Sequence, residues 1–146
     1  MGAGDDKIFA GPGDDMVMGG NGNDILRGGT GDDVLHGELG DDTIIGEMGN
    51  DTIRGGIGSD LLKGSEGDDV FEFAATEFAG GAMDEIVDFQ EDGYADVIKI
   101  FGSAGTTVDY DANTGVVSVD GTEAIKIDPN LEIEATQNGD DTWELF

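Results

Sequence analysis

The sequence predicts an all-β protein in which a stack of short repeated units is followed by a β-rich cap. Three observations predict this class: an uninterrupted nine-residue repeat over residues 1–72, the glycine and aspartate that dominate it, and short alternating apolar runs after it. A fixed short period is typical of stacked structural units that contact only their neighbours. We therefore divide the chain into a repeat domain at 1–72 and a C-terminal cap at 73–146.

Each of the eight nonapeptides has glycine at position 4, aspartate at position 6 and a large apolar residue at position 8. The glycines are Gly4, Gly13, Gly22, Gly31, Gly40, Gly49, Gly58 and Gly67. The aspartates are Asp6, Asp15, Asp24, Asp33, Asp42, Asp51, Asp60 and Asp69. The apolar residues are Ile8, Val17, Leu26, Leu35, Ile44, Ile53, Leu62 and Phe71.

The composition of one unit predicts its local structure. Glycine accepts positive φ, and Asp and Asn favour turns, so the first six positions are expected to form a turn. The last three, such as Ile25, Leu26 and Arg27, are expected to form a short strand. Side chains alternate along a strand, so Leu26 is predicted to face inward and its two neighbours outward.

The unit G-G-x-G-x-D-x-U-x, with U a large aliphatic residue, resembles the calcium-binding nonapeptide of RTX proteins. The resemblance implies a right-handed parallel β-roll with two nonapeptides per turn, so that Asp6 stacks on Asp24. It also implies that the position-6 aspartates bind calcium through their side chains and the position-4 glycines through their main-chain carbonyls. Calcium takes 6–8 oxygen ligands. Four turns then predict roughly six to eight ions.

Position 5 of the repeat leaves two alternatives open. It is Asp or Asn in seven copies and Ser59 in the other. These side chains are expected either to contribute to calcium binding or to hydrogen-bond to their own backbone in the turn.

Charge predicts that the repeats need the metal. Residues 1–72 contain 17 acidic and four basic side chains, a net charge of −13, and the whole chain carries −28. We expect these repeats to be disordered without calcium and to fold when it binds. The same charge excludes nucleic acid as a partner. The chain has no cysteine for disulfides and no apolar run long enough to be a transmembrane segment.

After residue 72 the apolar runs predict a β-sandwich-like cap with a short helix near residues 76–78. The predicted strands are residues 70–73, 86–89, 97–101, 116–119, 124–127 and 131–133. Residues 84–89 (D-E-I-V-D-F), 96–98 (D-V-I) and 110–116 (Y-D-A-N-T-G-V) resemble segments that follow the repeats in serralysin-type proteins. That resemblance implies Gram-negative type I secretion of a larger extracellular protein. Glu144, Leu145 and Phe146 fit its C-terminal export signal, or are simply part of the last strand.

Two further acidic groups deserve weighing as metal sites. Asp109, Asp111, Asn113 and Asp120 have EF-hand spacing, but position 6 of that loop is Thr114 rather than glycine, so a hairpin is predicted. Asp84, Asp88, Asp92 and Asp96 are four residues apart. Most of these four carboxylates are expected to be solvated, with one extra calcium at Asp84 or Asp88 as the alternative.

Nothing in the sequence indicates an enzyme. His36 is the only histidine and is expected to point to solvent. The favoured function is a calcium-binding folding and secretion module, and the alternative is a calcium-dependent adhesion or interaction module. The alternative depends on outward positions that are apolar and could form a dimer or bind a partner domain: Met16, Val34 and Val70 on one side, and Ile25, Ile45 and Leu61 on the other.

Overall fold

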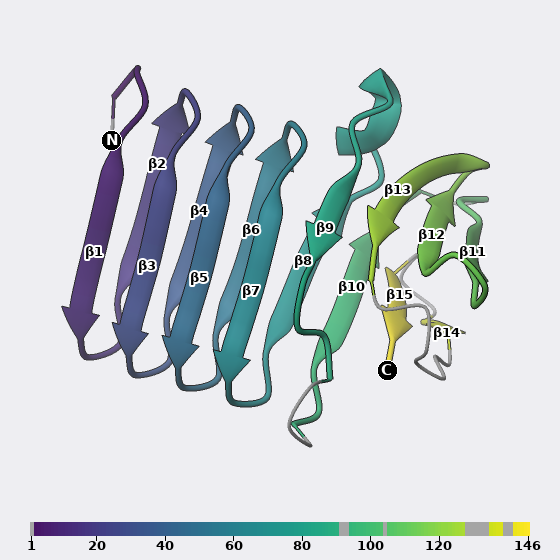
Figure 1. Ribbon diagram of the computed structural model, residues 1–146. Coiled ribbons are helices and arrows are strands. Elements are labelled where there is room, and N and C mark those ends of the chain that lie inside the picture. Colours follow the sequence, from purple (N-terminus) through teal and green to yellow (C-terminus); the bar gives the residue numbers. More distant parts are fainter. Residues whose placement is uncertain (1, 91–93, 104, 128–134, 139–141) are drawn as a thin grey trace.

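The computed structural model describes residues 2–90, 94–103, 105–127, 135–138 and 142–146. The strands of the repeats are β1 (Lys7–Pro12), β2 (Met16–Asn21), β3 (Ile25–Thr30), β4 (Val34–Leu39), β5 (Thr43–Met48), β6 (Thr52–Ile57), β7 (Leu61–Glu66) and β8 (Val70–Ala74). They form two facing rows of parallel strands, as Figure 1 shows.

Successive strands alternate between the two rows. β1, β3, β5 and β7 pair in one sheet, and β2, β4, β6 and β8 in the other. Partners lie 18 residues apart, as in the pairs Leu26↔Ile44 and Leu35↔Ile53. Two nonapeptides therefore make one turn, and the chain forms the parallel β-roll that the sequence predicts.

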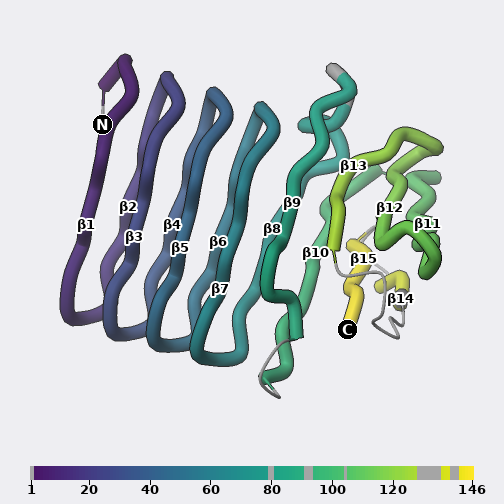
Figure 2. Tube along the Cα trace, in the orientation of Figure 1, coloured from purple at the N-terminus to yellow at the C-terminus, as the bar shows by residue number. Residues whose placement is uncertain are grey.

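The strands are longer than predicted. They contain six residues, or five in β8, instead of three. Pairing continues past the last outward residue of each unit, for example at Gly11↔Gly29, because units two repeats apart have the same backbone conformation. Only positions 4 to 6 form the turns, which lie in rows at the two ends of the strands (Figure 2).

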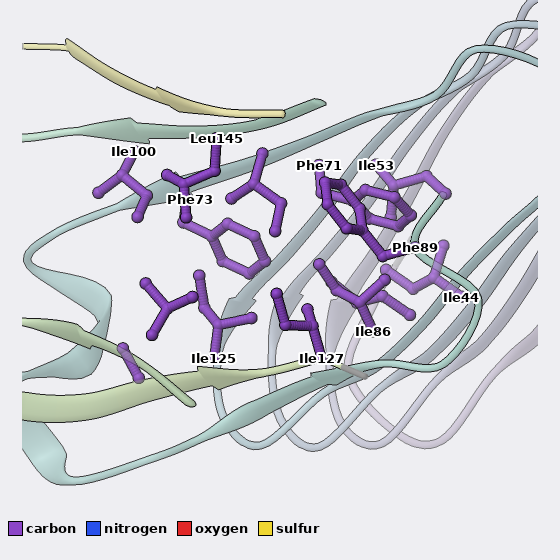
Figure 3. Close-up of a cluster of buried hydrophobic side chains, with 14 of the residues drawn as sticks. Ile44, Ile53, Phe71, Phe73, Ile86, Phe89, Ile100, Ile125, Ile127 and Leu145 are labelled. Carbon is purple, nitrogen blue, oxygen red and sulfur yellow. The ribbon is translucent and has the colours of Figure 1, made fainter. Parts of the chain in front are cut away.

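The core lies between the two sheets, where the position-8 side chains point as predicted. Leu26, Leu35, Ile44, Ile53 and Leu62 are fully buried. Ile8 is only partly buried, because it belongs to the first turn and has a neighbour on one side. Figure 3 shows the same core continuing from Phe71 of the last repeat to the rings of Phe73 and Phe89 beyond it.

The strands after residue 74 extend both sheets, and a short 3-10 helix precedes them. These elements are η1 (Glu77–Gly80), β9 (Asp84–Ile86), β10 (Val97–Phe101), β11 (Val108–Asp111), β12 (Val116–Val119), β13 (Thr122–Lys126), β14 (Ala135–Gln137) and β15 (Thr142–Leu145). One sheet has the order β1-β3-β5-β7-β9-β13-β12-β11, and the other β14-β15-β10-β8-β6-β4-β2. Both sheets thus cross residue 72 without a break, and β9 and β10 pair in parallel with the last strands of the repeats.

Several predicted cap elements are confirmed. Residues 97–101 and 116–119 are strands, and η1 lies where a short helix is predicted. The strand predicted at 86–89 is displaced toward the N-terminus and spans Asp84–Ile86. Its first residue, Asp84, pairs with Ile125 of β13. The predicted strand at 131–133 lies outside the described residues, and β14 was not predicted.

Candidate metal centre

The position-6 aspartates form a hydrogen-bond ladder along each row of turns. The N–H of Asp24 donates to Oδ1 of Asp42 at 2.7 Å, and the N–H of Asp42 donates to Oδ1 of Asp60 at 2.8 Å. In the other row, the N–H of Asp33 donates to Oδ1 of Asp51 at 2.8 Å. Each carboxylate thereby occupies the space between its own turn and the preceding one.

The second oxygen of these carboxylates has no partner. Asp24, Asp33, Asp42, Asp51, Asp60 and Asp69 are at most 2% exposed. The Oδ2 atom of each is buried without a hydrogen bond. An unpaired buried carboxylate oxygen is unfavourable by several kcal/mol unless a cation or a donor satisfies it, so roughly that free energy is available to a ligand here.

Glycine at position 1 keeps the space beside these oxygens open. A Cβ on Gly37 would lie 2.1 Å from Oδ2 of Asp42 and 2.6 Å from the carbonyl oxygen of Gly55. A Cβ on Gly46 would lie 2.1 Å from Oδ2 of Asp51. Carboxylate and carbonyl oxygens therefore surround a place that only a glycine leaves free.

Glycine at position 4 lets the turns approach each other. Gly40 has a φ of 127°, in the left-handed region that favours glycine, and a Cβ there would lie 2.1 Å from the carbonyl oxygen of Gly22. Gly49 has the same relation to the carbonyl oxygen of Gly31. The carbonyls that the sequence nominates as ligands therefore lie between successive turns.

Position 5 forms a second ladder, which runs in the opposite direction. The N–H of Asp41 donates to Oδ1 of Asn23 at 3.0 Å, and the N–H of Asn50 donates to Oδ1 of Asp32 at 2.8 Å. The second alternative for position 5 was a hydrogen bond to the residue's own backbone. These side chains instead accept hydrogen bonds from the next turn of the stack. They cross-link the stack.

Burial raises the pKa of four carboxyls in the later turns of the position-6 ladder. It is the largest cause of a pKa of about 6 for Asp42, Asp51 and Asp60, with the charge of the neighbouring ladder aspartate adding to it. The pKa of Asp69 rises to about 7 for the same reasons. A bound cation would reverse this effect by favouring the ionised form.

The donor set fits calcium better than other metals. Within the described residues, no three acidic or histidine side chains come together as a metal cluster. An ion here would depend on one or two carboxylates and several main-chain carbonyls, all hard oxygen donors. Calcium accepts such flexible all-oxygen coordination, whereas Zn²⁺ prefers nitrogen and sulfur donors.

The prediction that the cap carboxylates are solvated is wrong for three of them. Asp84, Asp88 and Asp96 are 1%, 7% and 4% exposed, and Asp92 lies outside the described residues. The sequence signal was available: Asp84 and Asp96 each begin an Asp-x-large-aliphatic triplet, as in the repeats. The triplets do not follow the nine-residue period, because Asp84 lies 24 residues after Asp60 and Asp96 lies 27 after Asp69.

Two other sequence inferences concern His36 and the EF-hand-like spacing. His36 is half-buried rather than pointing freely to solvent, and it lines a pocket of about 400 Å³ with Arg54 and Glu77. Asp111 is the last residue of β11, and its Oδ1 accepts the N–H of Asn113 at 2.9 Å at the start of the turn to β12. The hairpin prediction is confirmed.

Comparison with known protein families agrees with this geometry. The model of the RTX calcium-binding nonapeptide repeat (4 copies) matches residues 2–26, 18–53 and 45–75. The chain belongs to this RTX family, and its repeats are a calcium-binding module with a structural β-roll fold. No match was found among curated proteins. RTX repeats are typical of secreted proteins exported by type I secretion.

The family match ends at residue 75, so the resemblance of the cap to serralysin-type proteins stays a prediction. In the described part of the chain, no helix is long and apolar enough to cross a membrane.

Proposed function

We propose that the repeats bind roughly six to eight calcium ions through the position-6 aspartates and position-4 glycine carbonyls, and fold only when these ions bind. The six buried, unpartnered Oδ2 atoms of the repeats carry this proposal. Without a cation, folding brings these carboxylates together out of water, in a chain whose net charge is already −28. Calcium removes both costs, so its binding free energy becomes folding free energy.

We further propose that this module serves as a folding and secretion domain of a larger extracellular protein, exported from a Gram-negative cell by the type I machinery. Low cytosolic calcium would keep the repeats unfolded and able to thread through an export channel. Millimolar external calcium would then fold them. The family membership and the buried, unpartnered carboxylate oxygens of the ladder support this order of events.

The folding step is tested by circular dichroism of the chain during calcium titration after EDTA treatment. β signal should appear cooperatively at about 10⁻⁴–10⁻³ M calcium, the range of extracellular modules. Magnesium is the control, because its strict octahedral geometry and retained waters suit these turns poorly. Repeats that stay ordered in EDTA at pH 8 would contradict the proposal.

The export step has its own test. The chain should reach the medium from cells that carry a type I exporter and stay inside cells without one. Removing residues 142–146 tests whether the C-terminal strand also contains the export signal. Equal release with and without the exporter would reject this route.

One observation favours the interaction alternative as a second function. Met16 is 72% exposed on β2 and Phe9 is 67% exposed on β1, beside the open end of the roll. If the outer face of β2 around Met16 forms a dimer, sedimentation in calcium should detect it, and Met16→Ser should weaken it. A monomer at all concentrations would reject dimer formation through this face.

A further inference from the structure

The turns that join the roll to the cap have the geometry of repeat turns without the repeat sequence. The N–H of Asp60 donates to Oδ1 of Asp84 at 2.8 Å, as it would to a position-6 aspartate of a following repeat. The N–H of Glu85 donates to the carbonyl oxygen of Asp60 at 2.8 Å, as the N–H of Leu61 does to that of Asp42 at 2.9 Å. Asp84 therefore occupies position 6 of an additional turn.

The other row continues in the same way. The N–H of Asp69 donates to Oδ1 of Asp96 at 3.0 Å, and the N–H of Ala95 donates to Oδ1 of Asp68 at 2.9 Å. Both the position-6 and the position-5 ladders thus pass into the cap. The roll has a fifth turn that lies beyond the family match.

The two carboxylates of this fifth turn differ in one respect. Oδ2 of Asp96 accepts the N–H of Gln90 at 2.7 Å, so both of its oxygens are satisfied. Oδ2 of Asp84 is buried without a hydrogen bond, and the residue is 1% exposed. Asp84 therefore shares its environment with the six repeat aspartates, and Asp96 does not.

Nearby basic side chains do not neutralise Asp84. Within the described residues, the ion pairs at the junction join Arg54 to Glu77, Lys63 to Asp88 and Lys126 to Glu85. The carboxyl of Asp84 instead faces that of Asp60, and burial and this neighbour raise its pKa to about 8. Two adjacent buried carboxylates repel each other unless a cation lies between them, so this pair is suited to bind a cation.

We propose that Asp84 is a ligand of a further calcium ion, which binds where the last repeat turn meets the cap. This inference rests on the proposed calcium-driven folding of the repeats and adds a site outside the nonapeptides. The ion would act on β9, which pairs with β7 of the roll on one side and with β13 of the cap on the other. Calcium at Asp84 would therefore couple folding of the cap to folding of the roll.

Asp84→Asn in the full chain tests the site. The amide keeps the shape and an acceptor for the N–H of Asp60, but it loses the charge. We expect one fewer bound calcium by equilibrium dialysis, and a calcium midpoint about tenfold higher for the fluorescence of Trp143, the only tryptophan, which lies in the cap. Asp109→Asn is the matched control, because it makes the same charge change on an exposed cap strand and should alter neither value.

Asp24→Asn, at a repeat position, should also lose about one ion and shows that the count resolves a single site. An Asp84→Asn variant with the wild-type ion count and wild-type Trp143 midpoint would overturn the inference while leaving the repeats as calcium sites. A wild-type chain that binds no calcium would overturn the proposed function itself.

A crystal structure of the wild-type chain in calcium answers the same question if the variant does not fold. Anomalous scattering should place an ion beside Oδ2 of Asp84. Ions in the repeat turns with none at Asp84 would refute the junction site.

Discussion

The N–H of Asp33 donates to Oδ1 of Asp51 at 2.8 Å, while Oδ1 of Asp33 accepts the N–H of Asp15 at 2.8 Å. Asp33 thus bonds to the turn on each side of its own. Asp6 occurs in the first turn, where its N–H donates to Asp24 and its side chain remains half-buried. The contribution of an aspartate to the stack therefore depends on its place in it.

This difference predicts the effect of alanine substitutions. Asp33→Ala should raise the calcium midpoint of folding by about tenfold, because it removes a ligand and breaks the chain of contacts in the middle of the roll. Asp6→Ala should raise it less, because only an end turn frays. The midpoint is measured by circular dichroism, with Asp109→Ala as an exposed control. A larger shift for Asp6→Ala would contradict the one-dimensional stack.

Gly37→Ala tests the space beside the carboxylates. Its Cβ would meet Oδ2 of Asp42 at 2.1 Å, although Gly37 does not have a positive φ. We expect a lower free energy of unfolding in calcium by about 1–3 kcal/mol, as in other overpacked sites, and weaker calcium binding. Gly2→Ala is the control, since nothing lies within 4 Å of the position its Cβ would take. Equal calcium midpoints for the two variants would show that this space holds no ion.

The raised pKa values predict that acid partly replaces calcium. In the metal-free fold Asp42, Asp51 and Asp60 have pKa values of about 6, above the ordinary 3.8. The folded state therefore binds protons that the unfolded chain releases, so this contribution to stability is full below pH 3.8 and is lost as pH rises through about 6. In EDTA, circular dichroism should show more β structure at pH 5 than at pH 8.

The same protons compete with the metal, so the calcium midpoint should rise as pH falls from 8 to 5. Asp51→Asn combined with Asp60→Asn should flatten both dependences. A metal-free chain that loses β structure on acidification would show that the carboxyls do not titrate as this environment requires.

The number of ions is a direct test of the site assignment. Four turns predict three gaps between turns in each row, hence six calcium ions, with up to two more at the ends. Asp84 would supply the seventh. Calorimetry should find roughly six to eight ions per chain. Two or fewer at millimolar calcium would reject the stacked arrangement.

The sequence alone determined which face of the strands points inward, and its resemblance to RTX repeats implied the roll. The invariant period puts equivalent residues 18 apart once two units make a turn, and the structure pairs Leu26 with Ile44 in this way. It also nominated the position-6 aspartates, because aspartate recurs there without exception. When every unit has the same residues at the same positions, the chemistry of one unit is enough to predict the local structure of all of them.

Only the tertiary structure decided how the repeats end. Asp84 follows Asp60 by 24 residues and Asp96 follows Asp69 by 27, so neither keeps the 18-residue spacing that marks a ladder. Pairing of β9 with β7 and of β10 with β8 brings them into line. The physical reason is that extra residues in the connecting segments change the spacing along the chain but not the register of the strands, and register places a carboxylate in the stack.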